Sequence, residues 1–499
     1  MPKRSKTTRK PNTIPNPADF VATPSRPNSS TYFNFLKVRN LKCFGNDPQT
    51  LQLSRTDGRW SNWTIILGNN GTGKSTLLQA LAVVAAYNVQ EINELTGNSA
   101  KIPQEDLAGA PGTDVIGMHP LFSQVILQAG TRTDASGKAV PIETEVGVEF
   151  SNTSLSIDDR KRVTCKWNVL PNGDNGVQNF SASTQAVGPT HTKPTLVCAA
   201  YGAWRRLGKA AIAGPEQGDA FESRRHLFDE SKPLINAEDW VLRLDFASSK
   251  ASAETETYKK MFVQVKEALI ELLPSVKDLR THISGHRMVN PRVEFLTDYG
   301  WMPLRQLGYG YQSLVAWVVD FAARMFSAYP DCDRPCSQPA VCLVDEIDLH
   351  LHPSWQRKIM QYLTSLFPST QFIATAHSPL IVQAAPEIGA NVAVLRKVID
   401  HVEICNDPID VRGWRADQIL SSELFDETPL RSDDIQSLMD ERVRLLELPK
   451  LGPTEEARVQ EIESIIRGFP VGSGPGERAL NKYLAEAVKV LKKVKGKKK

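Results

Sequence analysis

Residues 68–75 carry a pattern suited to phosphate chemistry, because they match the spacing G-x-x-x-x-G-K-[ST] without a mismatch. Such a loop binds phosphate through backbone N–H groups at a helix N-terminus, where the helix dipole favours negative charge. We expect Lys74 to reach the β- and γ-phosphates and the Ser75 hydroxyl to bind Mg²⁺. An ordinary glycine-rich strand–helix turn is the alternative, which the lysine, the hydroxyl and the flanking residues disfavour. The positions expected to bind the nucleotide are Gly68, Asn69, Asn70, Gly71, Thr72, Gly73, Lys74, Ser75 and Thr76.

Two adjacent acids supply the partner that a phosphate loop needs. The apolar residues 341–344 predict a buried strand, which ends in Asp345 and Glu346. We expect Asp345 to hold Mg²⁺ opposite Ser75, directly or through water. Glu346 would polarise the attacking water as the general base. Strands that end in two acids are common by chance, so the prediction depends on the phosphate loop upstream.

His377 follows another apolar strand, residues 371–376, and lies thirty-one residues after Glu346. That interval fits one strand–helix–strand unit. In a parallel sheet the C-terminal ends of the strands meet at one edge. We therefore expect His377 beside the γ-phosphate as a second catalytic residue. The alternative is a histidine at a strand end without a catalytic role.

The elements that must position these residues follow from periodicity. Residues 31–44 and 49–67 predict short strands, and a helix follows the phosphate loop to about residue 88. The signal is β-type from 97 to 200, except that 171–190 is rich in Gly, Asn, Ser and Thr and predicts a loop.

The C-terminal half changes character. Residues 235–284 have a helical pattern, and a hairpin is expected over 292–306. Residues 314–328 form a nearly all-apolar helix, which must be buried. Residues 340–396 alternate strand and helix, as a parallel sheet requires. The last hundred residues are polar and helical in pattern.

Taken together, these motifs resemble an ABC-type ATPase. They comprise the phosphate loop, the acidic strand end, the strand-end histidine and Leu-Gly-Tyr-Gly-Tyr-Gln at 307–312. Residues 345–353 and 374–379 are similar to the SMC-like branch, which includes the overcoming-lysogenisation-defect ATPases and the ATPases of anti-phage systems such as Septu. The resemblance covers about residues 31–395, and over 97–300 only the general layout matches. It implies an α/β P-loop ABC-ATPase head with β-rich and helical insertions and a helical C-terminal region, with ATP and Mg²⁺ as cofactors.

The resemblance also assigns a signature motif, Leu-Ser-x-Gly-x-x, which in the family completes the nucleotide site of a partner in a head-to-tail dimer. The residues assigned to it are Leu307, Gly308, Gly310 and Gln312. Gly308 stands where the family usually has serine. A backbone N–H can still contact the γ-phosphate, but the hydroxyl is missing. For the glutamine-loop residue of the family, Gln124 and Arg205 are both candidates.

The expected domain organisation begins with a disordered basic tail at 1–30 and an ABC-type ATPase domain at 31–396. The ATPase domain comprises a first lobe at about 31–205, a helical insertion at about 206–290 and the signature and acidic-strand lobe at about 291–396. A helical region at 397–487 and a lysine-rich tail at 488–499 follow. Within the lysine-rich tail, residues 489–499 hold seven lysines and no acid.

Composition limits the class of protein. The 499 residues are 41% hydrophobic and 23% charged, and no run approaches the roughly 18 apolar residues of a membrane span. The net charge of +3 does not itself indicate nucleic-acid binding, although the basic ends could contact DNA. Seven scattered cysteines favour free thiols and a cytoplasmic location. Cys332, Cys336, His350 and His352 resemble a zinc quartet, but the two histidines are too closely spaced for that site to be expected.

Two classes of function share this nucleotide site. The first is a cytoplasmic SMC-like ATPase, working as a homodimer or higher oligomer and, by family analogy, as the ATPase or sensor subunit of an anti-phage system with a separate nuclease or other effector. A DNA-repair or chromosome-associated ATPase is an alternative within that class. The second is a transporter subunit, which the separation of 233 positions from Lys74 to Leu307 disfavours because transporters keep these motifs closer. Residues 390–499 lack an acid cluster of the kind a nuclease domain needs, so the chain itself is not expected to cut nucleic acid.

Overall fold

The computed structural model describes most of the chain between residues 31 and 466. The described residues fall within 31–85, 132–187, 196–208, 222–250, 255–284, 290–428, 432–448 and 452–466, with short gaps inside several of these ranges. Within 132–187 the strands are described without their side chains. The chain forms two compact units, unit 1 at Met1–Asp426 and unit 2 at Glu427–Lys499.

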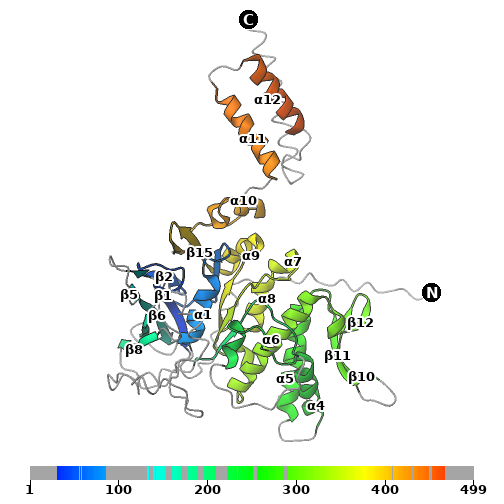
Figure 1. Ribbon diagram of the computed structural model, residues 1–499. Helices are drawn as coiled ribbons and strands as arrows, with labels where there is room; N and C mark the ends of the chain where they lie inside the picture. The colour runs from blue at the N-terminus through cyan, green and yellow to red at the C-terminus, as the bar shows by residue number, and fades with distance from the viewer. Residues whose placement is uncertain are drawn as a thin grey trace, which may run out of the picture. The chain divides into compact units, whose positions relative to one another are not determined.

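A six-stranded sheet forms the centre of unit 1 (Figure 1). Its order is β16–β15–β3–β14–β13–β9, and every neighbouring pair is parallel except β15 with β16. The strands are β3 (Trp63–Gly68), β9 (Cys198–Tyr201), β13 (Ala340–Val344), β14 (Thr370–Thr375), β15 (Asn391–Val398) and β16 (His401–Asn406). Because β3, β14 and β13 are parallel neighbours, the loops that follow them lie at one edge of the sheet.

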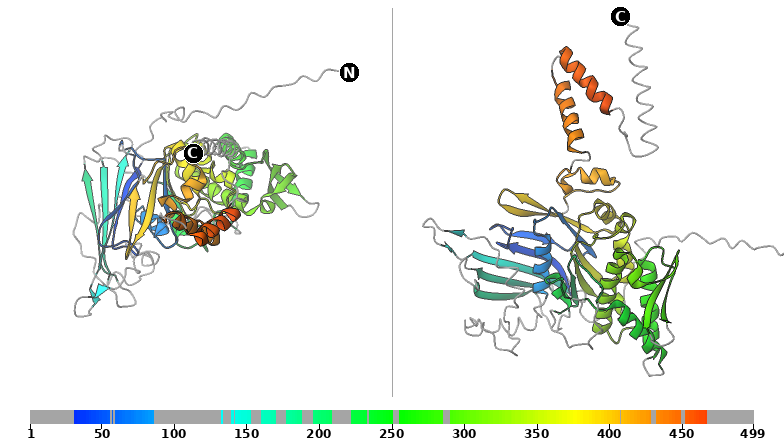
Figure 2. Two further views of the ribbon diagram at one scale, coloured as in Figure 1. Left: turned by 90° about the horizontal axis from the view of Figure 1, so that it is seen from above. Right: turned by 45° about the vertical axis from the view of Figure 1, so that its right-hand side comes forward.

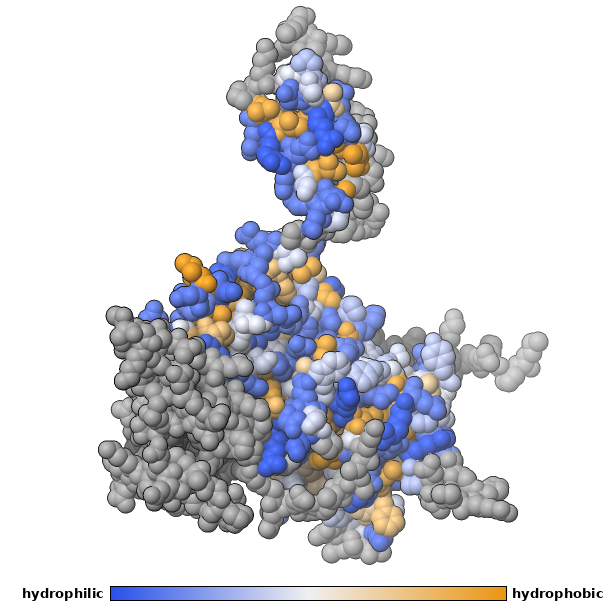
Figure 3. Space-filling model, viewed as in Figure 1, coloured by the Kyte–Doolittle hydropathy of each residue, from blue (hydrophilic) through white to orange (hydrophobic). Residues whose placement is uncertain are grey.

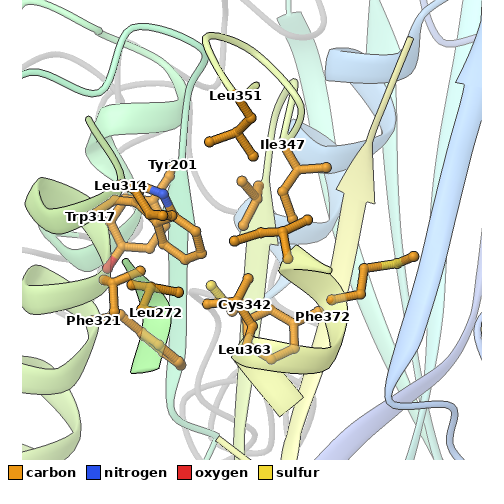
Figure 4. Close-up of a cluster of buried hydrophobic side chains, with 14 of the residues drawn as sticks. Tyr201, Leu272, Leu314, Trp317, Phe321, Cys342, Ile347, Leu351, Leu363 and Phe372 are labelled. Atoms are coloured by element: carbon orange, nitrogen blue, oxygen red, sulfur yellow. The ribbon is translucent and has the colours of Figure 1, made fainter. Parts of the chain in front are cut away.

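Helices cover one face of this sheet. They are α4 (Ala237–Ser249), α5 (Thr255–Leu272), α6 (Tyr309–Ala328) and α8 (Ile359–Leu366). Figure 4 shows part of the core between these helices and the sheet, where Trp317 and Phe321 of α6 lie near side chains of the central strands. Trp63 stacks on Phe372, with ring centroids 4.4 Å apart, which joins β3 to β14. Every residue of β13 and β14 is buried, as expected where both faces of a parallel sheet are covered.

On the other face, α1 (Lys74–Val84) packs between the central sheet and a second, antiparallel sheet (Figure 2). The second sheet has the order β2–β1–β6–β7–β8. Its strands are β1 (Thr31–Arg39), β2 (Gln49–Gln52), β6 (Ile142–Asn152), β7 (Arg160–Val169) and β8 (Val177–Val187). Leu77 and Leu81 of α1 share a core with Phe33 and Leu36 of β1. The helix after the phosphate loop is therefore packed against both sheets.

Smaller elements complete unit 1. A three-stranded sheet, β10 (Asp278–Ser284), β11 (Asn290–Thr297) and β12 (Gly300–Pro303), packs on α4 through β11. The other short elements are β4 (Arg132–Thr133), β5 (Ala139–Val140), α7 (Pro353–Gln356), α9 (Pro379–Ala384) and α10 (Ala416–Leu420).

Unit 2 contains a pair of helices, α11 (Asp433–Leu446) and α12 (Pro453–Ile466). Arg458 pairs with Glu441 and Arg442 pairs with Glu463, so two ion pairs join the helices. Hydrophobic surface alternates with hydrophilic surface on this pair in Figure 3, and Val443 and Leu446 are among its exposed side chains. Among the described residues, no helix has the length and apolar character needed to cross a membrane.

The α/β fold with β-rich and helical insertions is confirmed, while several local expectations were wrong. Residues 177–187, expected within a loop, form β8 and pair with β7. Residues 278–284, expected to be helical, form β10 and pair with β11. In both cases pairing with a neighbouring strand outweighs the local preference of the sequence.

Two boundaries also differ. Residues 401–406, placed in a region expected to be helical, form β16 at the edge of the central sheet. The buried helix α6 begins at Tyr309, five residues before the expected start at Leu314. Its first turn thus includes most of the signature stretch. The domain limits at 30, 396 and 487 stay predictions.

Candidate nucleotide site

The phosphate loop connects β3 directly to α1. Gly68, Gly71 and Gly73 have φ values of 145°, 79° and 89°, which residues other than glycine rarely adopt. A Cβ atom on Gly73 would also lie 2.5 Å from Cys43 Sγ. The side chain of Cys43 therefore packs directly against the backbone of the phosphate loop. The first N–H groups of an α-helix have no partner within the helix, so those at the start of α1 could bind an anion, as in phosphate-binding loops generally.

Lys74 is folded back into this loop. Its ammonium group donates to the carbonyl oxygens of Gly68 (2.6 Å) and Asn69 (2.9 Å). Burial lowers the pKa of Lys74, and the carboxylates of Asp345, Glu346 and Asp348 oppose that effect. The ammonium group therefore lies in a partly desolvated position, where a phosphate oxygen would replace a carbonyl as its partner.

Asp345 joins the phosphate loop to the central sheet. Its carboxylate accepts hydrogen bonds from Ser75 Oγ at 2.6 Å and from Thr375 Oγ1 at 2.5 Å. Asp345 is only 8% exposed. A serine hydroxyl beside a carboxylate provides the hard oxygen ligands that Mg²⁺ prefers, so this pair could hold the metal. The structure therefore brings the two predicted metal ligands together.

Glu346 adopts a left-handed backbone conformation directly after Asp345, with φ of 48°. Its backbone N–H donates to Thr375 Oγ1 at 2.7 Å. Thr375 thus contacts both acids of the site, a role the sequence analysis missed. In the sequence Thr375 is one residue of an apolar strand, and no local signal distinguishes it.

His377 lies at the same edge of the sheet, just after β14, and is exposed. Its backbone N–H donates to the Asp348 carboxylate, at 3.1 Å to one oxygen and 3.3 Å to the other. The two loops are linked a second time through Gln356, whose side chain donates to Asp348 O (3.3 Å) and accepts from Ser378 Oγ (2.7 Å). The catalytic assignments of Glu346 and His377 stay predictions.

The signature stretch lies at the start of α6. Gly308 is the N-cap, and the Gln312 side chain donates to Leu307 O at 2.7 Å. A Cβ atom on Gly310 would approach His350 O to 2.4 Å, so only glycine allows this close approach. The signature stretch therefore packs against the loop that follows Glu346. Its assignment to the nucleotide site of another copy stays a prediction.

The two candidates for the glutamine-loop residue have different outcomes. Gln124 lies outside the described residues. Arg205, after β9, is 2% exposed and donates to the backbone carbonyls of Asp345 and Glu346. Arg205 therefore contacts the site through the main chain. Nothing in its local sequence identifies these partners, which lie about 140 positions away.

The cysteines and histidines that resembled a zinc quartet do not converge. In the part of the chain that the structure describes, no group of three or more His, Cys, Asp or Glu side chains is arranged to hold a metal ion. Burial raises the pKa of Cys336 to about 12, which disfavours the thiolate that zinc requires.

Known families match two parts of the chain. Residues 36–188 match a family described as "AAA domain", and residues 204–383 match one described as "AAA domain, putative AbiEii toxin, Type IV TA system". The two segments contain the phosphate loop and the acidic strand end, respectively. A crystal structure of an Smc head bound to the C-terminal winged-helix domain of ScpA aligns with 75% of the chain, at 16% identity and a TM-score of 0.41.

Individual relatives come from two groups. The chain is 24% identical over 435 residues to the Septu protein PtuA of Bacillus mycoides, covering 86% of this chain and 49% of that protein. It is 30% identical over 364 residues to the retron Ec83 probable ATPase of Escherichia coli, covering 64% and 65% of the two chains. It is 21% identical over 479 residues to the retron Vc95 probable ATPase of Vibrio cholerae, covering 87% of each. The chain thus spans about half the length of the Septu relative. The chain is therefore similar to Septu PtuA and to the retron probable ATPases, and its two matched segments both resemble AAA domains.

Proposed function

We propose that the chain binds and hydrolyses ATP at a site completed by a second copy of the chain. The observation that supports this most directly is the 2.6 Å hydrogen bond between Ser75 Oγ and Asp345 Oδ2. It joins the phosphate loop to the acidic strand end across 270 positions of sequence, as a site for a triphosphate and a metal requires.

In this proposal each residue has a distinct task. Lys74 and the N–H groups of α1 bind the phosphates. Ser75 and Asp345 hold Mg²⁺, which would offset the negative charge of the phosphates. Glu346 takes the proton of the attacking water, and His377 lies beside the γ-phosphate. The signature residues Leu307, Gly308, Gly310 and Gln312 contact the nucleotide held by another copy.

Phosphate release by the purified chain tests the proposal. We expect turnover that requires Mg²⁺ and whose rate per molecule rises with protein concentration, because two copies form each site. The matched variant Glu346→Gln should bind ATP and release little phosphate. A folded wild-type protein that binds ATP but releases no phosphate would contradict the hydrolysis.

We further propose that this ATPase is the ATPase or sensor subunit of a bacterial anti-phage system and acts with a separate nuclease or other effector. The similarity to Septu PtuA and to two retron ATPases supports this class. Phage plating on bacteria that carry the gene with its native flanking genes tests it. Protection should be lost with Glu346→Gln, and equal protection by that allele would contradict a role for hydrolysis.

The chain itself is proposed not to cut nucleic acid. Phosphodiester cleavage usually needs a metal site, and none appears in the described residues apart from the nucleotide site. Incubation of the purified chain with DNA or RNA, Mg²⁺ or Mn²⁺, and ATP should leave the nucleic acid intact. Cleavage that survives purification and is lost on mutation outside the nucleotide site would show otherwise.

A further inference from the structure

Arg205 is a buried cation beneath the two acids of the candidate site. Its side chain is 2% exposed, and it is among the largest buried side chains of the chain. Burying a guanidinium is costly unless its donors are satisfied. The partners of Arg205 therefore indicate what its burial achieves.

Those partners are backbone carbonyls of the site itself. Nη1 donates to the oxygens of Gly202 (2.8 Å) and Asp345, and Nη2 donates to the oxygen of Glu346 (2.9 Å). One planar group thus holds two consecutive carbonyls, a geometry that suits the fork of arginine and not the single ammonium of lysine. Nε has no hydrogen-bond partner among the described residues.

The backbone that Arg205 holds is in an unfavourable conformation. Glu346 has φ of 48°, in a region that non-glycine residues adopt only when their surroundings impose it. Thr375 Oγ1 accepts the N–H of Glu346 on one side, while Arg205 binds its carbonyl on the other. These two contacts fix the turn from both ends of the residue.

The backbone just before Arg205 is itself held by hydrogen bonds. The N–H of Gly202 donates to His226 Nδ1 at 3.0 Å, and the N–H of Ala203 donates to Glu230 Oε1 at 2.9 Å. Burial lowers the pKa of Arg205 to about 10, against the opposing effect of nearby carboxylates. The guanidinium is therefore still charged at neutral pH.

We propose that Arg205 is the positioning residue that holds the Asp345–Glu346 turn, so that the Glu346 carboxylate faces the attacking water and the Asp345 carboxylate faces the metal. The proposal rests on the function proposed above. Arg205 acts through the main chain and touches neither water nor nucleotide. Its removal is therefore expected to change metal affinity and turnover more than nucleotide affinity.

The test compares Arg205→Gln and Arg205→Lys with wild type and with Arg206→Gln in the full chain. Arg206 is the exposed neighbour, which contacts the Trp204 ring, and its variant should behave as wild type. For both Arg205 variants we expect turnover and Mg²⁺ affinity each to fall by about 10–100-fold, as on loss of an outer contact that orients a metal ligand. Binding of a fluorescent ATP analogue without Mg²⁺ should be unchanged. Arg205→Lys should not restore turnover or Mg²⁺ affinity, because lysine keeps the charge but cannot bridge the two carbonyls.

A double variant separates positioning from a general structural effect. In the Glu346→Gln background and at saturating Mg²⁺, Arg205→Gln should cause no further loss of turnover, because the base that it positions is already absent and the weakened metal site is filled. Losses that multiply, or wild-type turnover and Mg²⁺ affinity in both Arg205 variants, would overturn the proposal. If Arg205→Gln fails to fold, the turnover and Mg²⁺ affinity of Arg205→Lys test the proposal in its place. If wild type hydrolyses no ATP, the proposed function fails, and the Mg²⁺ titration still tests the positioning.

Discussion

The carboxylate of Asp348 accepts the backbone N–H of His377, with its oxygens 3.1 Å and 3.3 Å from the nitrogen. Asp348 lies in the loop after Glu346, and His377 lies in the loop after β14. Burial raises the pKa of Asp348, and the hydrogen bond from His377 opposes this effect. The two loops are therefore joined before any nucleotide contributes. We expect a nucleotide that moves His377 to shift the loop after Glu346 as well.

Lys74→Ala should abolish or greatly weaken ATP binding. The substitution removes a charge-assisted contact to phosphate, which contributes about 1.5–3 kcal/mol to binding and more to turnover. Titration with a fluorescent ATP analogue measures the loss, with Lys397→Ala on the exposed side of β15 as control. Wild-type hydrolysis by the Lys74→Ala protein would refute the site assignment.

Glu346→Gln and Asp345→Asn should differ in kind. The first keeps shape and metal site but loses the base, so hydrolysis should slow by roughly 10²–10⁴-fold while the ATP-bound assembly accumulates. The second removes the charge that Ser75 and Thr375 contact, so a higher Mg²⁺ concentration should be needed. Mg²⁺ titrations of nucleotide binding distinguish them. Identical titrations would contradict the assignment of the base to Glu346 and of the metal contact to Asp345.

Completion of the site by a second copy can be tested by mixing two inactive proteins. Gly310→Val should spare ATP binding and block hydrolysis, because a Cβ at this position would approach His350 O to 2.4 Å and so displace the signature stretch. Mixed with Lys74→Ala protein, it should regain part of the turnover, since one hybrid site then has both halves intact. Failure of the mixture to release phosphate, with mixed dimers demonstrated by mass, would argue against a shared site.

His226 should make the stability of the chain depend on pH. Burial and the charge of Arg205 lower its pKa to about 4, from 6.5 in an exposed histidine. Below pH 6.5 the unfolded chain gains a proton that the folded chain does not, so stability falls with pH through the window from 6.5 to about 4. The stability difference between wild type and His226→Asn should shrink by about 2 kcal/mol from pH 7 to pH 5. Denaturant unfolding at both pH values measures it, and a constant difference would contradict the shift.

The meeting of the three site loops at one edge of the sheet could be predicted from the sequence because the motifs are local. The phosphate loop, Asp345–Glu346 and His377 each follow an apolar strand, and parallel strands bring their ends together. The tertiary partners were not accessible. Arg205 contacts backbone carbonyls, which carry no side-chain signature, and Thr375 appears in sequence as an ordinary strand residue.

The errors in the fold have a shared cause. Residues 177–187 are rich in small polar residues and 278–284 follow a helical pattern, yet both lie in strands. Each pairs with a neighbouring strand along almost its whole length. Strand formation depends more on neighbours than helix formation does, so local composition is a weak guide there.

The position of β3 in the sheet has a consequence for synthesis on the ribosome. Both of its neighbours, β14 and β15, are encoded after residue 369. At about 5–20 residues per second, the apolar strand leaves the ribosome roughly 15–60 s before either neighbour is made. We therefore expect nascent chains to expose β3 for that time and to depend on chaperones, and chains truncated before β14 to aggregate instead of forming half of the nucleotide site.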